Sequence, residues 1–156
     1  MAYFTAYDSP LGELLLLSDG AALTGLDLEP HTPETGTQKD DLPVFAQTKA
    51  WLDSYFAGTP RPIDVPLDPQ GTVFQQRVWG ALLGIGYGAT CTYGELAREL
   101  GCSSPQAVGQ AVGRNPIGIL IPCHRVVGAK GRLTGYAWGV ERKQWLLEQE
   151  ARRKER

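Results

Sequence analysis

Four prolines fall within ten residues of the segment TPRPIDVPLDPQG, at Pro60, Pro62, Pro66 and Pro69. Proline lacks a backbone N–H and clashes with the preceding helical turn, so this density excludes a helix and predicts an extended connection. The net charge changes sign at the same place. Residues 1–70 carry 3 basic against 11 acidic side chains, a net of −8, whereas residues 71–156 carry 12 against 6, a net of +6. We therefore predict an α/β domain over 1–70 and a second domain over 71–156, with a linker near 58–71.

The segment before the prolines has the pattern of a small α/β domain. Apolar runs flank Asp19-Gly20, a turn dipeptide typical of a β-hairpin. After a polar loop at 31–41, aromatic and apolar residues recur at helical spacing over 43–58, with Gly58 as the expected stop. The sequence predicts a hairpin or small sheet followed by one helix.

The second half carries the start signals of three helices. Thr72 and Gln75 have capping-box spacing, as do Thr92 and Glu95. A third helix is expected to begin at Ser103 or Ser104, with Pro105 in its first turn. The last two helices, separated by a turn at Gly101, are typical of a helix-turn-helix. The fold class is therefore α+β: a small N-terminal sheet-plus-helix domain, then a mostly helical domain with a helix-turn-helix and a basic tail at 151–156.

The predicted third helix is unusual because it contains Gly109 and Gly113, each of which costs about 1 kcal/mol relative to alanine. Such a helix needs close backbone approach to something. A neighbouring helix or a DNA duplex would each explain it, and the glycines alone do not choose between them.

Composition limits the classes of partner and compartment. The positive second half favours a polyanion, although a solvated basic face is the alternative, and the tail supplies 4 of its 12 positive charges. No apolar run approaches the roughly 20 residues that span a bilayer, and the N-terminus does not resemble a signal peptide. Three cysteines without CxxC spacing suggest free thiols in a reducing cytosol, so we expect a cytoplasmic protein with access to the nucleoid if it is bacterial.

The segment ILIPCHR places a thiol and an imidazole next to each other after an apolar run. A nearby imidazole or cation favours the reactive thiolate, so His124 and Arg125 are suitable companions for Cys123. Adjacent residues on a strand point to opposite faces, so contact would need a bridging water or a turn, which Pro122 favours. The alternative is a buried structural cysteine. From spacing alone, Glu150 is expected to be an exposed helical charge.

The run from Thr72 to Glu150 resembles the O6-alkylguanine-DNA alkyltransferases, also called methylated-DNA–protein-cysteine methyltransferases. The resemblance is carried by FQQRVWGALLGIGYGATCTYGELA, by AVGQAVGRNPIGILIPCHRVVGAKGRLTGYAWGVERKQWLLEQE and above all by PCHRV. It covers about half of the chain and is highly specific. Residues 1–70 are compatible with the family's variable first domain.

The resemblance implies a suicide reaction in which Cys123 takes the alkyl group from O6 of guanine in DNA, once and irreversibly. O4-alkylthymine is a second candidate substrate. His124 would relay the thiol proton through a water, with Glu150 as third member of the network. Asn115 would brace the turn that holds the site, and Tyr93 would help to neutralise the leaving guanine.

The resemblance also implies a pocket and a DNA-binding face. The pocket is expected to comprise Pro122, Tyr136, Ala137 and Trp138. The helix from Pro105 to Arg114 would lie in the minor groove, and the target nucleotide would flip out of the duplex. The expected DNA-binding residues are Thr92, Tyr93, Gln106, Ala107, Gly109, Arg114, Lys130 and Arg132; Arg125 belongs either to this set or to the interior.

The sequence departs from the family's pattern in three places. Gln106 stands where an arginine commonly fills the space left by the flipped base. Trp138 occupies a pocket position that is small in many relatives, so it is expected to disfavour bulky adducts. Some relatives hold zinc in the first domain, but residues 1–70 contain no cysteine and only His31, so no metal or other cofactor is expected.

The predicted partner is double-stranded DNA containing alkylated guanine, bound by a monomer, with cooperative binding left open and no membrane involved. Three alternatives are a non-catalytic binder or sensor of damaged bases, a helix-turn-helix regulator and a thiol hydrolase. A pure binder needs no thiol before His124. A hydrolase would not explain the basic half of the chain.

Overall fold

The computed structural model describes residues 2–28 and 36–154. Much of the polar loop predicted at 31–41 and the last two residues of the basic tail lie outside the described residues. The chain divides into two compact units. Unit 1 comprises residues 1–70 together with 116–118, and unit 2 comprises residues 71–115 and 119–156.

Unit 1 contains a four-stranded sheet with the order β3-β2-β1-β4. The strands are β1 (Tyr3–Ser9), β2 (Gly12–Ser18), β3 (Leu23–Leu28) and β4 (Thr37–Gln38). The hairpin predicted at Asp19-Gly20 is confirmed: it joins β2 to β3, and the Asp19 carboxylate accepts hydrogen bonds from the backbone N–H groups of Ala21 and Ala22, both at 2.9 Å. The short strand β4, which pairs parallel with β1, was not predicted.

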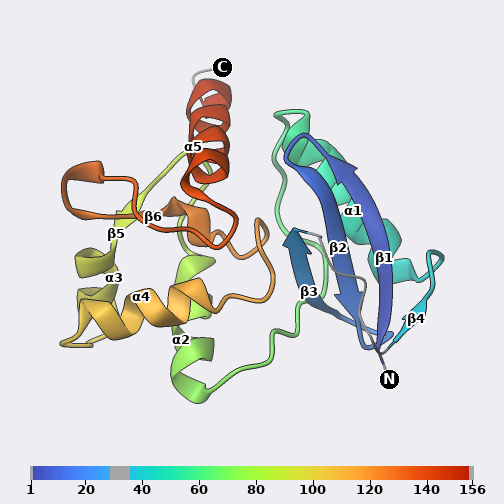
Figure 1. The fold of residues 1–156 in the computed structure, drawn as a ribbon, viewed down its shortest axis with the longest axis horizontal. Coiled ribbons are helices and arrows are strands. Elements are labelled where there is room, and N and C mark those ends of the chain that lie inside the picture. Colours follow the sequence, from blue (N-terminus) through green and yellow to red (C-terminus); the bar gives the residue numbers. More distant parts are fainter. Residues whose placement is uncertain (1, 29–35, 155–156) are drawn as a thin grey trace. The chain divides into compact units, whose positions relative to one another are not determined.

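One helix, α1 (Pro43–Phe56), lies along one face of this sheet (Figure 1). Its buried side chains include Phe45, Trp51 and Leu52, which form the core with leucines of β2 and β3. Gly58 follows the helix with a φ of +82°, a left-handed conformation that glycine adopts at little cost. The predicted helix and its glycine stop are confirmed.

The outer edge of β3 is covered by two extended segments of unit 1. The Leu23 N–H donates to Pro66 O at 2.8 Å, and the Asp68 N–H donates back to Leu23 O. Further along, the Leu26 N–H donates to Pro116 O at 2.9 Å. The proline-rich segment is therefore extended, as predicted, but part of it pairs with the sheet. Such cover protects an exposed strand edge from pairing with other chains.

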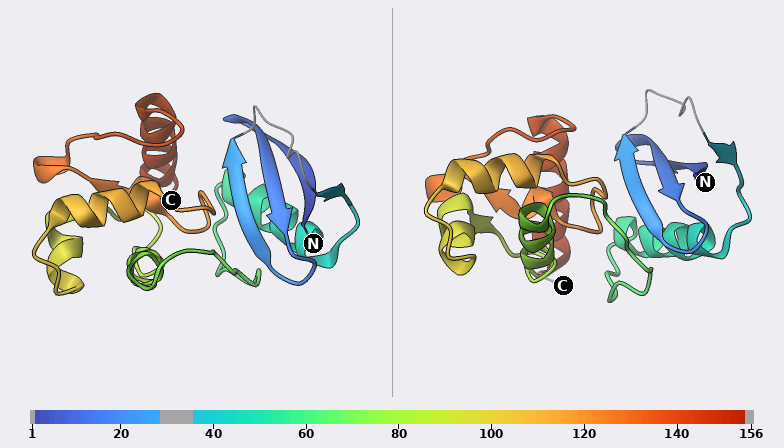
Figure 2. Two further views of the ribbon diagram at one scale, coloured as in Figure 1. Left: turned by 60° about the horizontal axis from the view of Figure 1, so that its bottom comes forward. Right: turned by 90° about the horizontal axis from the view of Figure 1, so that it is seen from below.

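Unit 2 is mainly helical. Its helices are α2 (Val73–Leu82), α3 (Tyr93–Glu99), α4 (Pro105–Gly113) and α5 (Val140–Lys154); its strands are β5 (Cys91–Thr92) and β6 (Val126–Val127), and its 3-10 turns are η1 (Cys123–Arg125) and η2 (Ala129–Gly131). Both predicted capping boxes are present, and Ser104 caps α4. Helices α3 and α4 pack together across the turn at Gly101, so the predicted helix-turn-helix is confirmed (Figure 2). No helix within the described ranges is long and apolar enough to cross a membrane.

The glycines of α4 are not required by packing inside unit 2. A Cβ atom built on Gly109 would lie 3.7 Å from the Tyr93 ring, an ordinary van der Waals contact, and one on Gly113 would meet nothing within 4 Å. An alanine therefore fits at either position. Tight packing on a neighbouring helix therefore does not explain why glycine stands at these two positions.

Candidate active site

A two-stranded ladder fixes the site's framework. Strand β6 follows η1 directly and pairs parallel with β5, so that Cys91 lies opposite Val126 and Thr92 opposite Val127. Because α3 begins immediately after β5, the ladder holds the start of α3 beside the turn that carries Cys123. The Thr134 hydroxyl adds a second link by donating to the Tyr93 hydroxyl at 3.2 Å.

Cys123 begins a 3-10 turn rather than continuing a strand. Pro122 precedes it, and Asn115 braces the approach by donating from Nδ2 to Ile121 O at 2.8 Å. Ile119, four residues before the cysteine, has a φ of +68°, a left-handed conformation that is strained for a β-branched residue. The tertiary structure therefore holds this segment in a shape that its residues do not prefer locally.

The residue Cys123 is buried, with only 9% of its surface exposed. Burial raises its pKa, and hydrogen bonds from Asn115 and Tyr136 and the charge of Lys143 oppose that effect only in part. The thiol is therefore protonated in the resting protein. Since the thiolate is the nucleophile, a base must take the proton inside the site.

His124 is completely buried, and its Nε2 atom lies 2.6 Å from Glu150 Oε2. Its Nδ1 atom has no hydrogen-bond partner in the part of the chain that the structure describes. Burial lowers the pKa of His124, aided by the charges of Arg125 and Lys143 and opposed by Glu150. The neutral ring therefore donates from Nε2 to the carboxylate, which leaves the Nδ1 lone pair to accept a proton.

Glu150 lies at the centre of the buried network. Arg125 donates to it twice, from Nε to Oε1 at 2.8 Å and from Nη2 to Oε2 at 3.2 Å, and the Gly88 N–H donates to Oε1 at 3.2 Å. Burial raises the pKa of Glu150, but its hydrogen bonds with His124 and Arg125 and the positive charge of Arg125 outweigh that effect and lower the pKa to about 2. The expectation from spacing, an exposed charge, is wrong because α5 turns this side chain inward.

Arg125 belongs to the interior. Besides its two bonds to Glu150, it donates from Nη1 to Ile85 O at 2.7 Å, and its guanidinium carbon lies 5.8 Å from the centre of the Tyr87 ring. The side chain is about one tenth exposed. Of the two predicted positions for Arg125, the structure has the internal one.

Lys143 is a buried residue that the sequence analysis missed. It lies on α5 two turns before Glu150, and its Nζ donates to Thr134 O at 3.5 Å. Burial lowers its pKa, while the neighbouring Cys123 opposes that shift. Its burial could have been predicted from spacing, because Lys143, Leu146 and Glu150 follow the i, i+3, i+7 pattern of one helix face.

The predicted pocket residues come from two segments of unit 2. Pro122 precedes η1, and the other three lie in the loop before α5. The Tyr136 and Trp138 rings are tilted by 59° with centroids 5.8 Å apart; Trp138 is buried, Tyr136 half-buried and Ala137 exposed. Tyr136 also reaches the Cys123 thiol, as the effect of its hydrogen bond on the thiol's pKa indicates. The loop thus brings the Tyr136 side chain to the thiol, with Trp138 packed beside Tyr136.

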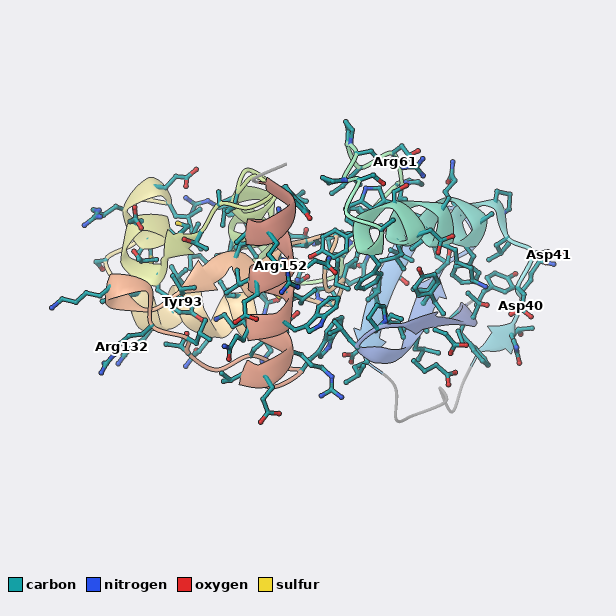
Figure 3. The ribbon with its side chains drawn as sticks, turned by 90° about the horizontal axis from the view of Figure 1, so that it is seen from above. Asp40, Asp41, Arg61, Tyr93, Arg132 and Arg152 are labelled. Atoms are coloured by element: carbon teal, nitrogen blue, oxygen red, sulfur yellow. The ribbon has the colours of Figure 1, made fainter. Side chains whose placement is uncertain are left out.

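The predicted DNA-binding residues lie on α3, α4 and η2 or at their ends. Gln106, Arg114, Lys130 and Arg132 are exposed, and the other members, Thr92, Tyr93, Ala107 and Gly109, are half-buried. Figure 3 shows the Arg132 side chain extending away from the ribbon beyond η2. A cavity of about 560 Å³ adjoins this set, lined in part by Ala107 and Arg114. In the described ranges no group of three or more His, Cys, Asp or Glu side chains is arranged to hold a metal, and His31 lies outside those ranges.

Comparison with known proteins covers both halves of the chain. Residues 73–152 match the family model of the 6-O-methylguanine DNA methyltransferase DNA-binding domain, and residues 2–69 match that of the ribonuclease-like domain. The methylated-DNA–protein-cysteine methyltransferase of Mycobacterium tuberculosis is 46% identical, covering 98% of this chain and 94% of that protein. The Haemophilus influenzae protein of the same name is 46% identical over 95% of this chain and 86% of its own. The crystal structure of M. tuberculosis OGT in complex with DNA has a TM-score of 0.89 at 47% identity, covering 97% and 94% of the two chains.

Proposed function

The chain belongs to the methylated-DNA–protein-cysteine methyltransferase family, and from this premise we propose that it repairs alkylated DNA by taking the alkyl group onto Cys123. The observation that carries the proposal is the buried thiol beside a neutral histidine that is already paired with an ionised carboxylate. The same scaffold without a thiol would serve a sensor of damaged bases or a regulator. The thiol and its base favour the reactive alternative.

The reaction begins with a proton transfer. The Cys123 proton passes through a water to Nδ1 of His124, whose Nε2–H stays bonded to Glu150. The thiolate sulfur attacks the alkyl carbon, the carbon–O6 bond breaks, and its electron pair goes to the guanine. The Tyr93 hydroxyl supports the leaving base by supplying a proton. Because the new thioether does not hydrolyse, each molecule reacts once and irreversibly.

The buried position of the thiol requires the base to leave the duplex. A stacked guanine cannot bring O6 to the thiol of a buried cysteine, so the nucleotide rotates out at a cost of a few kcal/mol. Helix α4 approaches the minor groove, where its glycines let the backbone come close. Gln106 then faces the orphaned cytosine with hydrogen bonds but without charge.

O6-alkylguanine in double-stranded DNA is the main substrate, and O4-alkylthymine is a second one. Residues 71–156 form the DNA-binding and acceptor domain, which acts as a monomer. The three free cysteines suit a reducing cytoplasm, where the chain reaches its DNA.

The decisive experiment incubates the protein with duplex DNA that contains one O6-methylguanine and then measures its intact mass. The expected result is a mass increase of one CH₂ group per protein molecule, located on Cys123 by peptide mapping, with no second turnover when DNA is in excess. An unchanged mass, with DNA binding verified in the same sample, contradicts the proposal.

The DNA face can be tested through salt dependence. Lys130→Gln and Arg132→Gln should each weaken duplex binding whatever the DNA sequence, because their charges meet phosphates. Each should also reduce the slope of log affinity against log salt by about 0.9. Fluorescence anisotropy over a salt series measures both effects, and Arg61→Gln in unit 1 is the charge-matched control. Slopes equal to wild type would remove these residues from the interface.

Trp138 can be tested as a limit on adduct size. Trp138→Gly should raise the rate with O6-benzylguanine relative to O6-methylguanine, because the buried indole beside Tyr136 occupies pocket volume. Trp138→Phe keeps an aromatic ring and should change the ratio less. Rates come from the loss of unreacted Cys123 over time. An unchanged benzyl-to-methyl ratio in Trp138→Gly would assign the indole to packing alone.

A further inference from the structure

The Glu150 carboxylate is shared between a base and a permanent cation. Its Oε2 atom faces His124 Nε2 at 2.6 Å and accepts from Arg125 Nη2 at 3.2 Å. Its Oε1 atom accepts from Arg125 Nε at 2.8 Å. Both oxygens therefore contact the guanidinium, and the negative charge is compensated whether or not His124 carries a proton.

Because Glu150 is shared with Arg125, it stabilises a protonated His124 less than an unshared carboxylate would. A carboxylate that contacts only a histidine stabilises the imidazolium, as in the Ser-His-Asp triad. Here a guanidinium, which cannot lose its charge, has already neutralised that carboxylate. The attraction left for a second cation on His124 is correspondingly smaller.

A second cation near His124, Lys143, acts in the same direction as Arg125 and opposes a positive charge on the ring. Helix α5 contributes Glu150 and Lys143, and η1 contributes Cys123 and Arg125. While the thiol is protonated, these neighbours comprise one anion and two cations. A third positive charge in this buried space would be uncompensated, which is costly in a low-dielectric environment.

We propose that Arg125 is a positioning residue of the transfer reaction: by pairing with Glu150 at both oxygens, it keeps His124 uncharged and able to take the Cys123 proton. The proposal rests on the proposed function for the reaction, but the charge state of His124 can be measured without it. Burial and the neighbouring cations lower the pKa of His124, in agreement with this role. The imidazolium that forms during transfer is then a strong acid, which passes its proton on readily.

The experiment measures the titration of His124 by NMR in protein labelled with ¹⁵N-histidine. The chain has two histidines, so a His31→Gln variant assigns both signals. In the wild type His124 should stay neutral down to a pH below its ordinary pKa of about 6.5. In Arg125→Gln the pKa should rise by about one unit. Arg125→Lys keeps the charge but loses the two-point pairing, so its rise should be smaller.

The matching kinetic readout is the pH profile of alkyl transfer. Arg125→Gln should move the acidic limb to higher pH, so that the tenfold loss of rate falls about one pH unit above that of wild type. Damage to the fold alone would lower the rate equally at every pH. If Arg125→Gln does not fold, Arg125→Lys must still show its smaller rise.

Two results would overturn the proposal: a wild-type His124 that is charged at neutral pH, or variants whose His124 pKa equals or falls below the wild-type value. A wild-type protein that transfers no alkyl group would defeat the proposed function. The NMR titration would still decide the charge state of His124 in that case.

Discussion

Cys123→Ser is expected to abolish alkyl transfer while leaving the affinity for DNA close to that of wild type. A serine hydroxyl is nearly the size of a thiol, so the tight space beneath the Asn115 brace remains filled. The hydroxyl is a far weaker acid than a thiol, so His124 cannot generate a comparable nucleophile. Intact mass after incubation with methylated duplex measures transfer, and fluorescence anisotropy measures binding.

Cys91→Ser and Cys102→Ser are the matched controls for this variant. Both residues are half-buried, and their thiols donate to backbone carbonyl groups, Cys91 to Thr92 O and Cys102 to Ser104 O. Each control should accept one alkyl group at the wild-type rate. An alkyl group found on Cys91 or Cys102 after Cys123→Ser would show that the acceptor had been assigned to the wrong residue.

Glu150→Gln is expected to lower the free energy of unfolding by about 3 kcal/mol and to slow alkyl transfer. The substitution keeps the shape of the side chain but leaves the Arg125 guanidinium buried without its counter-charge, and breaking a buried ion pair in this way typically costs about 3–5 kcal/mol. The amide oxygen retains part of the hydrogen bonding, which places the expected loss at the lower end. Urea unfolding followed by tryptophan fluorescence gives the midpoint and slope.

Glu148→Gln makes the same chemical change on the exposed face of α5, where Glu148 accepts a hydrogen bond from Gln144 at 2.9 Å. Its effect should stay within about 0.5 kcal/mol. Equal stabilities for the two variants would mean that the buried pair contributes nothing net. A destabilised Glu150→Gln protein that still reacted at the wild-type rate would limit Glu150 to a structural role.

Several elements of the fold could be predicted because their signals are local. A capping box needs a threonine and an acceptor three residues later, and both boxes occur where the sequence places them. The Asp19-Gly20 hairpin and the glycine after α1 likewise depend on side chains acting on their own backbone. The parallel pairing of β4 with β1 was missed because two residues carry no periodic pattern.

The features of the site likewise separate into those with a local sequence signal and those that depend on tertiary packing. The sequence by itself determined the thiol, the adjacent imidazole and the turn-forming proline, and through PCHRV it determined the family resemblance. The resemblance also named Glu150 as a member of the network, whereas spacing alone assigned it to the surface. Only the tertiary structure decided which charges are buried together, because Glu150 lies 26 positions from His124. The structure also placed Arg125 inside and added Lys143 to the cluster. The physical reason is that burial depends on which helix faces meet, and the face of α5 that meets η1 is selected by packing across the whole unit.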